Sequence, residues 1–120
     1  MNKQHDDLID KIRTRPEAVE FQEVIDMIDT HYIYTPTSFI NGTGDTAVTN
    51  SSGENEGSCK IFSFAKINEL DQAQTLNCFG HYYRDDVLNN PDGQDHANIR
   101  TFMKHGWKHV NFEKTALNKR

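Results

Sequence analysis

Apolar residues recur at helical spacing in the first quarter of the chain. Leu8, Ile9 and Ile12 predict a short helix over residues 6–14. A second helix is expected directly after Pro16, because proline suits the first helical position. The apolar residues that follow it lie mostly three or four positions apart: Phe21, Val24, Ile25 and Ile28. The chain therefore opens with two amphipathic helices.

The pattern changes after residue 31. Residues 32–40, "YIYTPTSFI", are rich in β-branched and aromatic side chains, which favour extended structure. Pro36 cannot donate a ladder hydrogen bond, so we expect an edge strand or an extended segment here. Residues 41–57 are dense in Gly, Asn, Ser and Thr, which predicts a long loop with at most a small hairpin around it.

The second half predicts three more helices. Ser58 can cap a third helix over "CKIFSFAKINEL", although apolar residues are dense enough there for a buried strand. Asp71 and Gln74 form a capping-box pattern for a fourth helix over residues 72–89. After the turn "NNPDG", a last helix is expected over about 96–105, with Gly106 as its C-terminal cap. Residues 109–114 could form a short strand.

These elements predict a mainly α fold. At 120 residues the chain fits one compact domain, spanning residues 1–120, of about five helices with at most a small β-hairpin. We see no internal repeat and no domain linker.

Charge is unevenly distributed along the chain. The formal net charge of −5 argues against a nucleic-acid partner, which would require an excess of positive charge. Residues 100–120 nevertheless hold six Lys or Arg against one acid, Glu113, and residues 114–120 form a basic tail. This basic end could dock an acidic partner, fold back on the domain, or remain a solvated tail.

Hydropathy and cysteine content indicate a soluble, cytoplasmic protein without a membrane partner. No apolar run approaches the ~20 residues that a membrane span needs, and the first residues lack the apolar core of a secretory signal. Cys59 and Cys78 are too few for a disulfide scaffold, so we expect them to be small buried hydrophobes.

Residues 81–100 are the first candidate for chemistry. His81 and Asp85 are four apart and share a helix face with Arg84 alongside, as a base with its carboxylate or as two metal ligands would. The turn at 89–93 would bring His96 towards them, together with Asn98 and Arg100. His81, Asp85 and His96 could then hold a divalent metal with an open position for hydrolysis. The alternative is an exposed i,i+4 pair, with Asp95 capping the last helix.

A second candidate is "NEGSC", residues 55–59, which contains Asn55, Glu56, Ser58 and Cys59. A Gly-Ser step that enters a helix presents free backbone N–H groups to an anion. Cys59 in that first turn would have a lowered thiol pKa if solvent reached it, and His81 could then act as its base. The alternative is helix capping beside a buried cysteine. No phosphate-binding loop or nucleophile-elbow motif is present.

Four stretches together resemble one family: "YTPTSFING", "NEGSCKIFSFA", "TLNCFGHYYRDDVLNNPDG" and "DHANIRTFMKHGW". In this order and spacing they resemble the HopJ type III effector family over about residues 20–113. The resemblance implies a bacterial virulence protein injected into plant cells by a type III secretion system, and it brings no catalytic residues with it. The first dozen residues, "MNKQHDDLIDKI", are acidic and helical, whereas type III export signals are typically Ser-rich, unstructured and poor in acids.

Three functional hypotheses follow. The first is a small HopJ-like protein that acts by binding a ligand or a protein partner, which would be a host protein if the chain is exported. The second is a small enzyme, such as a metal-dependent hydrolase, or a ligand-binding protein with its site between the last three helices. A third is an adaptor that uses its basic C-terminal segment. The sequence does not determine a cofactor, a substrate or an oligomeric state. The candidate site residues are Asn55, Glu56, Ser58, Cys59, His81, Arg84, Asp85, His96, Asn98 and Arg100.

Overall fold

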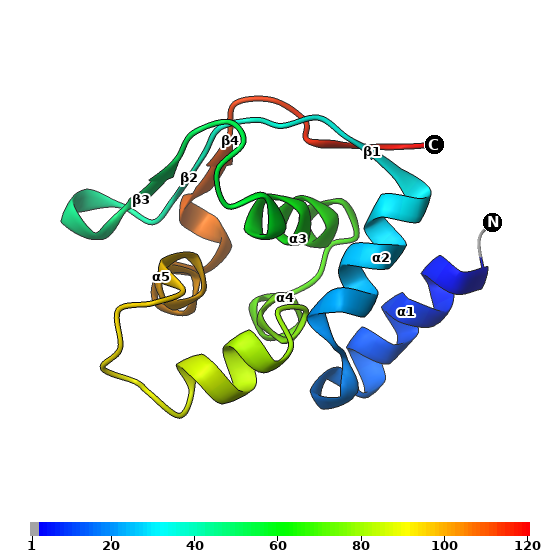
Figure 1. Cartoon of the computed structure of the whole chain (residues 1–120), viewed down its shortest axis with the longest axis horizontal. Coiled ribbons are helices and arrows are strands. Elements are labelled where there is room, and N and C mark those ends of the chain that lie inside the picture. The colour runs from blue at the N-terminus through cyan, green and yellow to red at the C-terminus, as the bar shows by residue number, and fades with distance from the viewer. Residues whose placement is uncertain (1–2) are drawn as a thin grey trace.

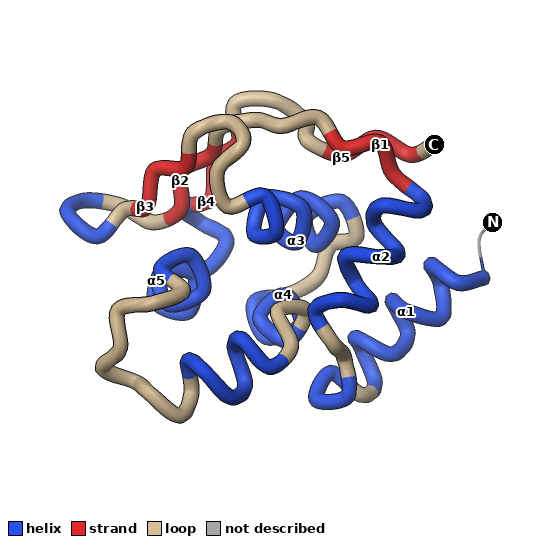
Figure 2. Tube along the Cα trace, viewed as in Figure 1, coloured by secondary structure: helices blue, strands red, loops and turns tan. Residues whose placement is uncertain are grey.

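Helices and two small sheets surround a central helix in the computed structural model of the chain, which describes residues 3–120 (Figures 1 and 2). The helices are α1 (Lys3–Thr14), α2 (Phe21–His31), α3 (Glu56–Ile67), α4 (Gln72–Asn77), the π-helix η3 (Tyr82–Val87) and α5 (Ala97–His105). The strands are β1 (Tyr32–Tyr34), β2 (Phe39–Asn41), β3 (Val48–Asn50), β4 (Val110–Phe112) and β5 (Leu117–Lys119). Single 3-10 turns occupy Pro16–Ala18, Gly44–Thr46 and Gly106–His109.

Helix α3 is the centre of the core. Both strand layers lie above it in Figure 1, α2 lies on one side, and α4 and α5 lie below. Its residues from Ile61 to Ala65 are all buried. A helix that is covered on every side is apolar all round. For this reason the dense apolar residues of the α3 sequence were also compatible with a buried strand. The prediction of a helix was right.

The first two helices form an antiparallel pair. Helix α1 buries Leu8, Ile9 and Ile12, as its spacing predicted. The second helix begins later than predicted, at Phe21, because residues 16–18 form a 3-10 turn. Its start is a capping box in which the Glu23 carboxylate accepts the backbone N–H of Glu20 at 2.9 Å.

The strand content exceeds the single small hairpin that the sequence predicts. Within residues 3–120, β3, β2 and β4 form one antiparallel sheet, and β1 pairs with β5 in another. The β2–β3 hairpin lies where the small hairpin was expected, but β4 and β5 come from the C-terminal end. Leu117 is buried opposite Tyr34. The basic end of the chain thus folds back on its own domain.

The predicted continuous helix over residues 72–89 is interrupted. Its capping box is present, with the Asp71 carboxylate accepting the Gln74 N–H at 2.7 Å. Helix α4 then ends at Asn77, and Gly80 adopts φ +60° before η3 begins. A Cβ at Gly80 would lie 2.6 Å from the backbone nitrogen of Phe21, so glycine permits both the turn and the close approach of α2.

The last helix ends as predicted, at Gly106, which adopts φ +65°. Its start differs from the prediction, because the N-cap is His96 in the left-handed conformation and not Asp95. Asp95 instead accepts a hydrogen bond from the Arg100 guanidinium at 2.7 Å. None of the helices formed by residues 3–120 is long and apolar enough to cross a membrane.

Candidate ligand-binding pocket

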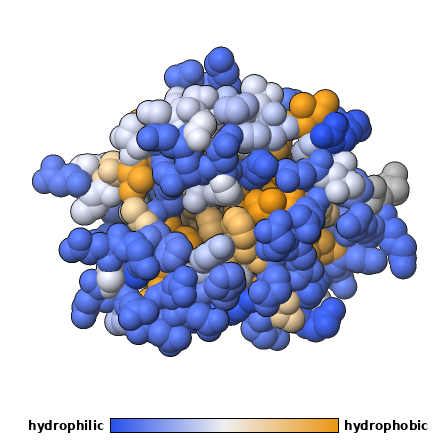
Figure 3. Space-filling view, viewed as in Figure 1, coloured by the Kyte–Doolittle hydropathy of each residue, from blue (hydrophilic) through white to orange (hydrophobic). Residues whose placement is uncertain are grey.

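A cavity of about 390 Å³ lies between the first turns of α3 and α5, the start of α2 and the segment that joins α4 to η3. Its walls combine aromatic, aliphatic, amide, hydroxyl and imidazole groups. In the space-filling view, apolar side chains gather below α3, near the middle of a largely hydrophilic face (Figure 3). The lining residues are Phe21, Asn55, Gly57, Ser58, Phe79, Tyr82, His96, Ala97, Asn98 and Ile99.

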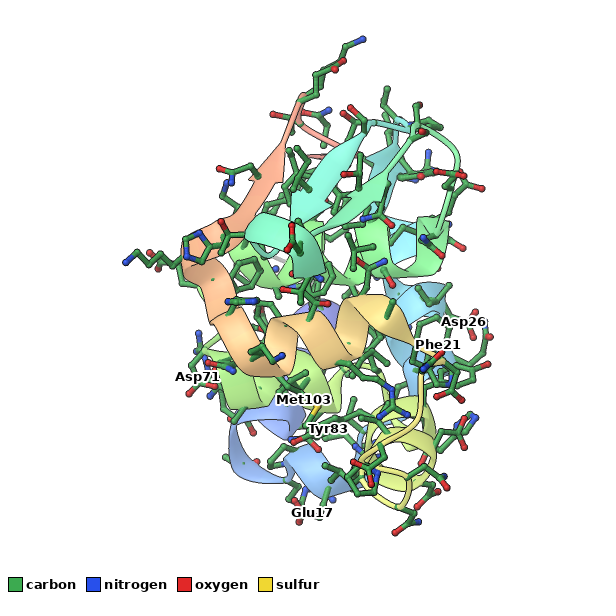
Figure 4. All side chains as sticks on the ribbon, turned by 90° about the vertical axis from the view of Figure 1, so that its left-hand side faces the viewer. Glu17, Phe21, Asp26, Asp71, Tyr83 and Met103 are labelled. Atoms are coloured by element: carbon green, nitrogen blue, oxygen red, sulfur yellow. The ribbon has the colours of Figure 1, made fainter. Side chains whose placement is uncertain are left out.

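Aromatic rings form the apolar part of the cavity. Phe21, the first residue of α2, stacks on Phe79 with ring centroids 6.5 Å apart and meets Tyr82 edge-on at 5.1 Å. Figure 4 shows Phe21 close to the beginning of α5, and residues of that first turn line the cavity. The turn at Gly80 lies between Phe79 and Tyr82 and brings both rings towards α2. The backbone break in the predicted fourth helix therefore shapes this wall.

The start of α3 forms a polar wall. Asn55 precedes the helix in the left-handed conformation, with φ +49°, and its carbonyl accepts the Cys59 N–H at 3.0 Å. Ser58 was predicted to cap this helix, but it lies within the first turn. Helices α2 and α4 have capping boxes, whereas among the described residues no side chain caps α3 or α5. The first N–H groups of both helices are consequently available as donors near the cavity.

Four asparagines connect these two helix starts. The Asn50 and Asn98 amides exchange hydrogen bonds at 3.2 and 2.9 Å, and both residues are buried. Asn55 Nδ2 donates to Asn50 Oδ1 at 2.6 Å, and Asn41 Nδ2 donates to Asn98 Oδ1 at 3.1 Å. Because Asn41 and Asn50 belong to the β2–β3 hairpin, the hairpin fixes the positions of Asn55 and Asn98 at the cavity wall.

His96 contributes an imidazole held by a carboxylate. Its Nε2 lies 3.1 Å from Asp86 Oδ2 and 3.8 Å from Asp95 Oδ2. Its ring centroid is 5.3 Å from that of Tyr82, which in turn is 4.2 Å from that of His81. A hydrogen bond from Arg100, more than any other interaction, lowers the pKa of Asp95. The Asp86 contact orients the His96 ring at the edge of the cavity.

The predicted convergence of His81, Asp85 and His96 is not found. His81 and Asp85 are exposed, and only His96 lines the cavity. Within residues 3–120, no group of three or more His, Cys, Asp or Glu residues is placed to hold a metal ion. The carboxylate that reaches His96 comes from Asp86, one position beyond Asp85, because η3 is a π-helix and turns its side chains differently from the α-helix assumed.

Both candidate arginines hold the backbone together. The Arg84 guanidinium donates to the carbonyls of Pro16 and Asn77 at 3.2 Å each, and also to the carbonyl of Val19. Arg100 donates to the carbonyls of Asp95 and Asn90 at 2.6 and 2.8 Å. Neither arginine lines the cavity, so we assign them to the scaffold around it.

The predicted reactive thiol is also not supported. Cys59 is 1% exposed, and burial raises its pKa even though hydrogen bonds involving Tyr34 and Ser63 oppose that shift. Because the thiolate is the nucleophile, Cys59 is an inert, buried side chain at neutral pH. Glu56 is exposed beside Tyr34 and contributes, after burial, to the raised pKa of Tyr34.

The residues that the sequence predicted and the cavity contains are Asn55, Ser58, His96 and Asn98. Sequence reasoning missed the aromatic wall, because Phe21, Phe79 and Tyr82 fit an apolar stripe equally well. It also missed Asn41 and Asn50. Asn41 and Asn50 lie in or beside a segment that was treated as an extended strand and a polar loop, and no local signal indicated that their amides would be buried.

Comparisons with known proteins place this geometry in context. The family model described as "HopJ type III effector protein" matches residues 5–117. A solved structure, the crystal structure of the unknown-function protein VPA0580, is 42% identical to this chain. The match covers 100% of this chain and 95% of that one, with a TM-score of 0.91. Among curated proteins, none matches the sequence.

Proposed function

Because the chain belongs to the HopJ type III effector protein family, we propose that its domain acts by binding a small ligand in the cavity between the starts of α3 and α5. One observation carries this proposal. Asn55, Ser58, His96 and Asn98, from two segments far apart in sequence, line one cavity together with an aromatic wall. A concave, partly apolar site with a few convergent polar groups is the usual form of a small-molecule site.

The walls indicate the chemistry of the ligand. Phe21 and Tyr82 offer ring faces and edges to a flat apolar group. The opposite wall offers the Ser58 hydroxyl and the first backbone N–H groups of α3, which donate to oxygen atoms. A small ligand that carries an aromatic or other planar part and one or two oxygen acceptors fits this arrangement. A volume of about 390 Å³ limits its size.

Several of the polar groups are held in place before any ligand arrives. The Asn98 amide is held by Asn41 and Asn50, and the His96 ring is held by Asp86. A wall whose rotamers are already fixed loses little conformational entropy on binding. This preorganisation favours recognition of one ligand shape.

A ligand screen followed by NMR tests the proposal. A library of small aromatic acids, amides and heterocycles would be added to the ¹⁵N-labelled protein. We expect hits to shift the amide signals of residues 55–58 and 96–99. Tyr82→Leu and Ser58→Ala should weaken such binding, whereas Ile33→Ala, at an exposed position on β1, should leave it unchanged. Hits that shift only other regions, or no hits at all, would refute the proposed site.

We propose, as a second role, that the chain is an exported effector, and the family description carries this proposal. Helix α1 buries Leu8, Ile9 and Ile12 against the domain, so an export signal in this region would have to be read from an unfolded chain. A fusion of the whole chain to a translocation reporter tests export. A signal that requires the secretion apparatus is expected, and an equal signal in an apparatus-deficient strain, or none, would contradict it.

A further inference from the structure

Two of the exposed large apolar side chains of the described chain line one groove. Leu88 is 47% exposed and Met103 is 36% exposed, and both border a cavity of about 740 Å³ beside α5. We propose that this groove docks an amphipathic, acidic segment of a partner protein. We call it the α5 groove and define it by Val87, Leu88, Pro91, Arg100, Met103 and Lys104.

The groove lies between α5 and the segment that runs from the end of η3 through the turn at residues 89–95. Figure 4 shows Met103 projecting from α5 on the side where that segment lies. The turn is fastened to α5 by Arg100, which donates to the carbonyls of Asn90 and Asp95. The two walls are thus joined at one end, and the apolar side chains between them remain in contact with water.

Charge indicates the kind of segment that would bind. The α5 side of the groove carries Arg100 and Lys104 and no acid, whereas the turn on the other side carries the exposed acids Asp92 and Asp95. Arg100 is paired with Asp95 at 2.7 Å, whereas Lys104 forms no ion pair within residues 3–120.

An acidic amphipathic helix matches these features. Apolar residues on one face would cover Leu88 and Met103, and carboxylates at the edge would lie near Lys104. Opposite charges across the edge would speed association and orient the segment, while the apolar contacts would provide most of the affinity. This surface shares only Ala97 with the ligand cavity, and none of its defining residues lines that cavity, so the two proposals can fail independently.

Selection from a displayed library of 16-residue helical peptides tests the inference. Peptides would be selected on the native protein and counter-selected on Met103→Glu, which places a carboxylate in the groove. We expect the surviving peptides to combine aliphatic residues at helical spacing with several acids. A synthetic peptide with the consensus sequence should bind, and its Glu→Lys counterpart should bind at least about tenfold more weakly.

Matched variants locate the binding site. Leu88→Glu and Lys104→Glu should each weaken the peptide by about tenfold or more, whereas Ile33→Glu, an equally exposed apolar site on β1, should not. Thermal melting checks that each variant folds. Three outcomes would overturn the inference: no enrichment over the counter-selected protein, enrichment of peptides without acids, or a dimer in sedimentation that Met103→Glu dissociates. The last outcome would assign the groove to a second copy of this chain.

Discussion

Asn50 and Asn98 each donate a side-chain hydrogen bond to the other, at 3.2 and 2.9 Å, inside the protein and 48 residues apart in sequence. This reciprocal pair joins the β2–β3 hairpin to the first turn of α5. Because both amides are buried, this exchange, together with the bonds from Asn41 and Asn55, replaces the hydrogen bonds to water that they lose on folding.

We expect Asn98→Ala to lower the free energy of unfolding by about 1–3 kcal/mol, because it removes the buried side-chain hydrogen bonds of Asn98 with Asn50 and Asn41. The Asn41 amide then keeps only the backbone carbonyl of residue 98, at 2.8 Å. Urea denaturation measures the loss. Asn89→Ala, at an exposed position, is the control and should change stability little. Equal stability of the two variants would show that the asparagine network is not a stabilising feature.

Arg84→Lys is expected to destabilise the fold by about 2–3 kcal/mol, although the charge is conserved. Lysine cannot reproduce the planar fork that reaches the carbonyls of Pro16, Val19 and Asn77 together. Arg13→Lys, on the exposed side of α1, serves as the matched control in the same denaturation experiment. Full tolerance of Arg84→Lys would mean that those contacts contribute little.

Substitution of two glycines separates a steric clash from the cost of backbone conformation. Gly80 and Gly53 both have positive φ, at +60° and +90°. A Cβ at Gly80 meets the backbone of Phe21, whereas a Cβ at Gly53 has no neighbour within 4 Å. We expect Gly53→Ala to cost about 1 kcal/mol and Gly80→Ala roughly 3 kcal/mol, measured by thermal unfolding. Similar losses at both sites would argue against close packing at Gly80.

The protein should lose stability as the pH rises above about 9, the usual thiol pKa. Burial, followed by the nearby charge of Glu23, raises the pKa of Cys78 to about 12. The unfolded chain therefore releases this proton first, and each further pH unit favours unfolding by up to about 1.4 kcal/mol. Urea unfolding at pH 8, 9 and 10 measures the slope. Cys78→Ala should reduce the slope but not abolish it, because burial also raises the pKa of Cys59. An unchanged slope would assign the loss to other groups.

Local sequence signals predicted the positions of helices and strands better than they predicted which of these elements pack together. The capping box at Asp71 and Gln74 lies within one turn, so its residue types alone predict the start of α4. The pairing of β1 with β5 joins residues from the first third of the chain to its C-terminal end, and three-residue strands carry too little alternation to reveal it. The sequence therefore predicted most of the helices and the short strand that contains β4, but it predicted neither the break within residues 72–89 nor which strands pair.

The candidate site was predicted only in part, again because local signals do not reveal which residues are neighbours in space. Asn55 and His96 were identified because polar residues at helix starts are conspicuous, and both lie at the cavity. The sequence did not predict which of the candidate side chains contact one another in the folded protein. The expected pair of His81 and Asp85 assumed α-helical geometry. Residues 82–87 instead form a π-helix, and Asp86 is the residue that contacts His96.

The distribution of the cavity walls along the chain determines when the protein can bind a ligand. Its walls come from the start of α2, the start of α3, the turn after α4 and the start of α5, so no fragment shorter than residues 21–99 contains all of its lining residues. A nascent chain would gain the site only after Ile99 had been synthesised and packed, and one proteolytic cut that separated α2 from α5 would abolish it. Ligand binding should therefore report an intact, fully folded chain, and a molecule that is unfolded for transport would be inactive until it refolds.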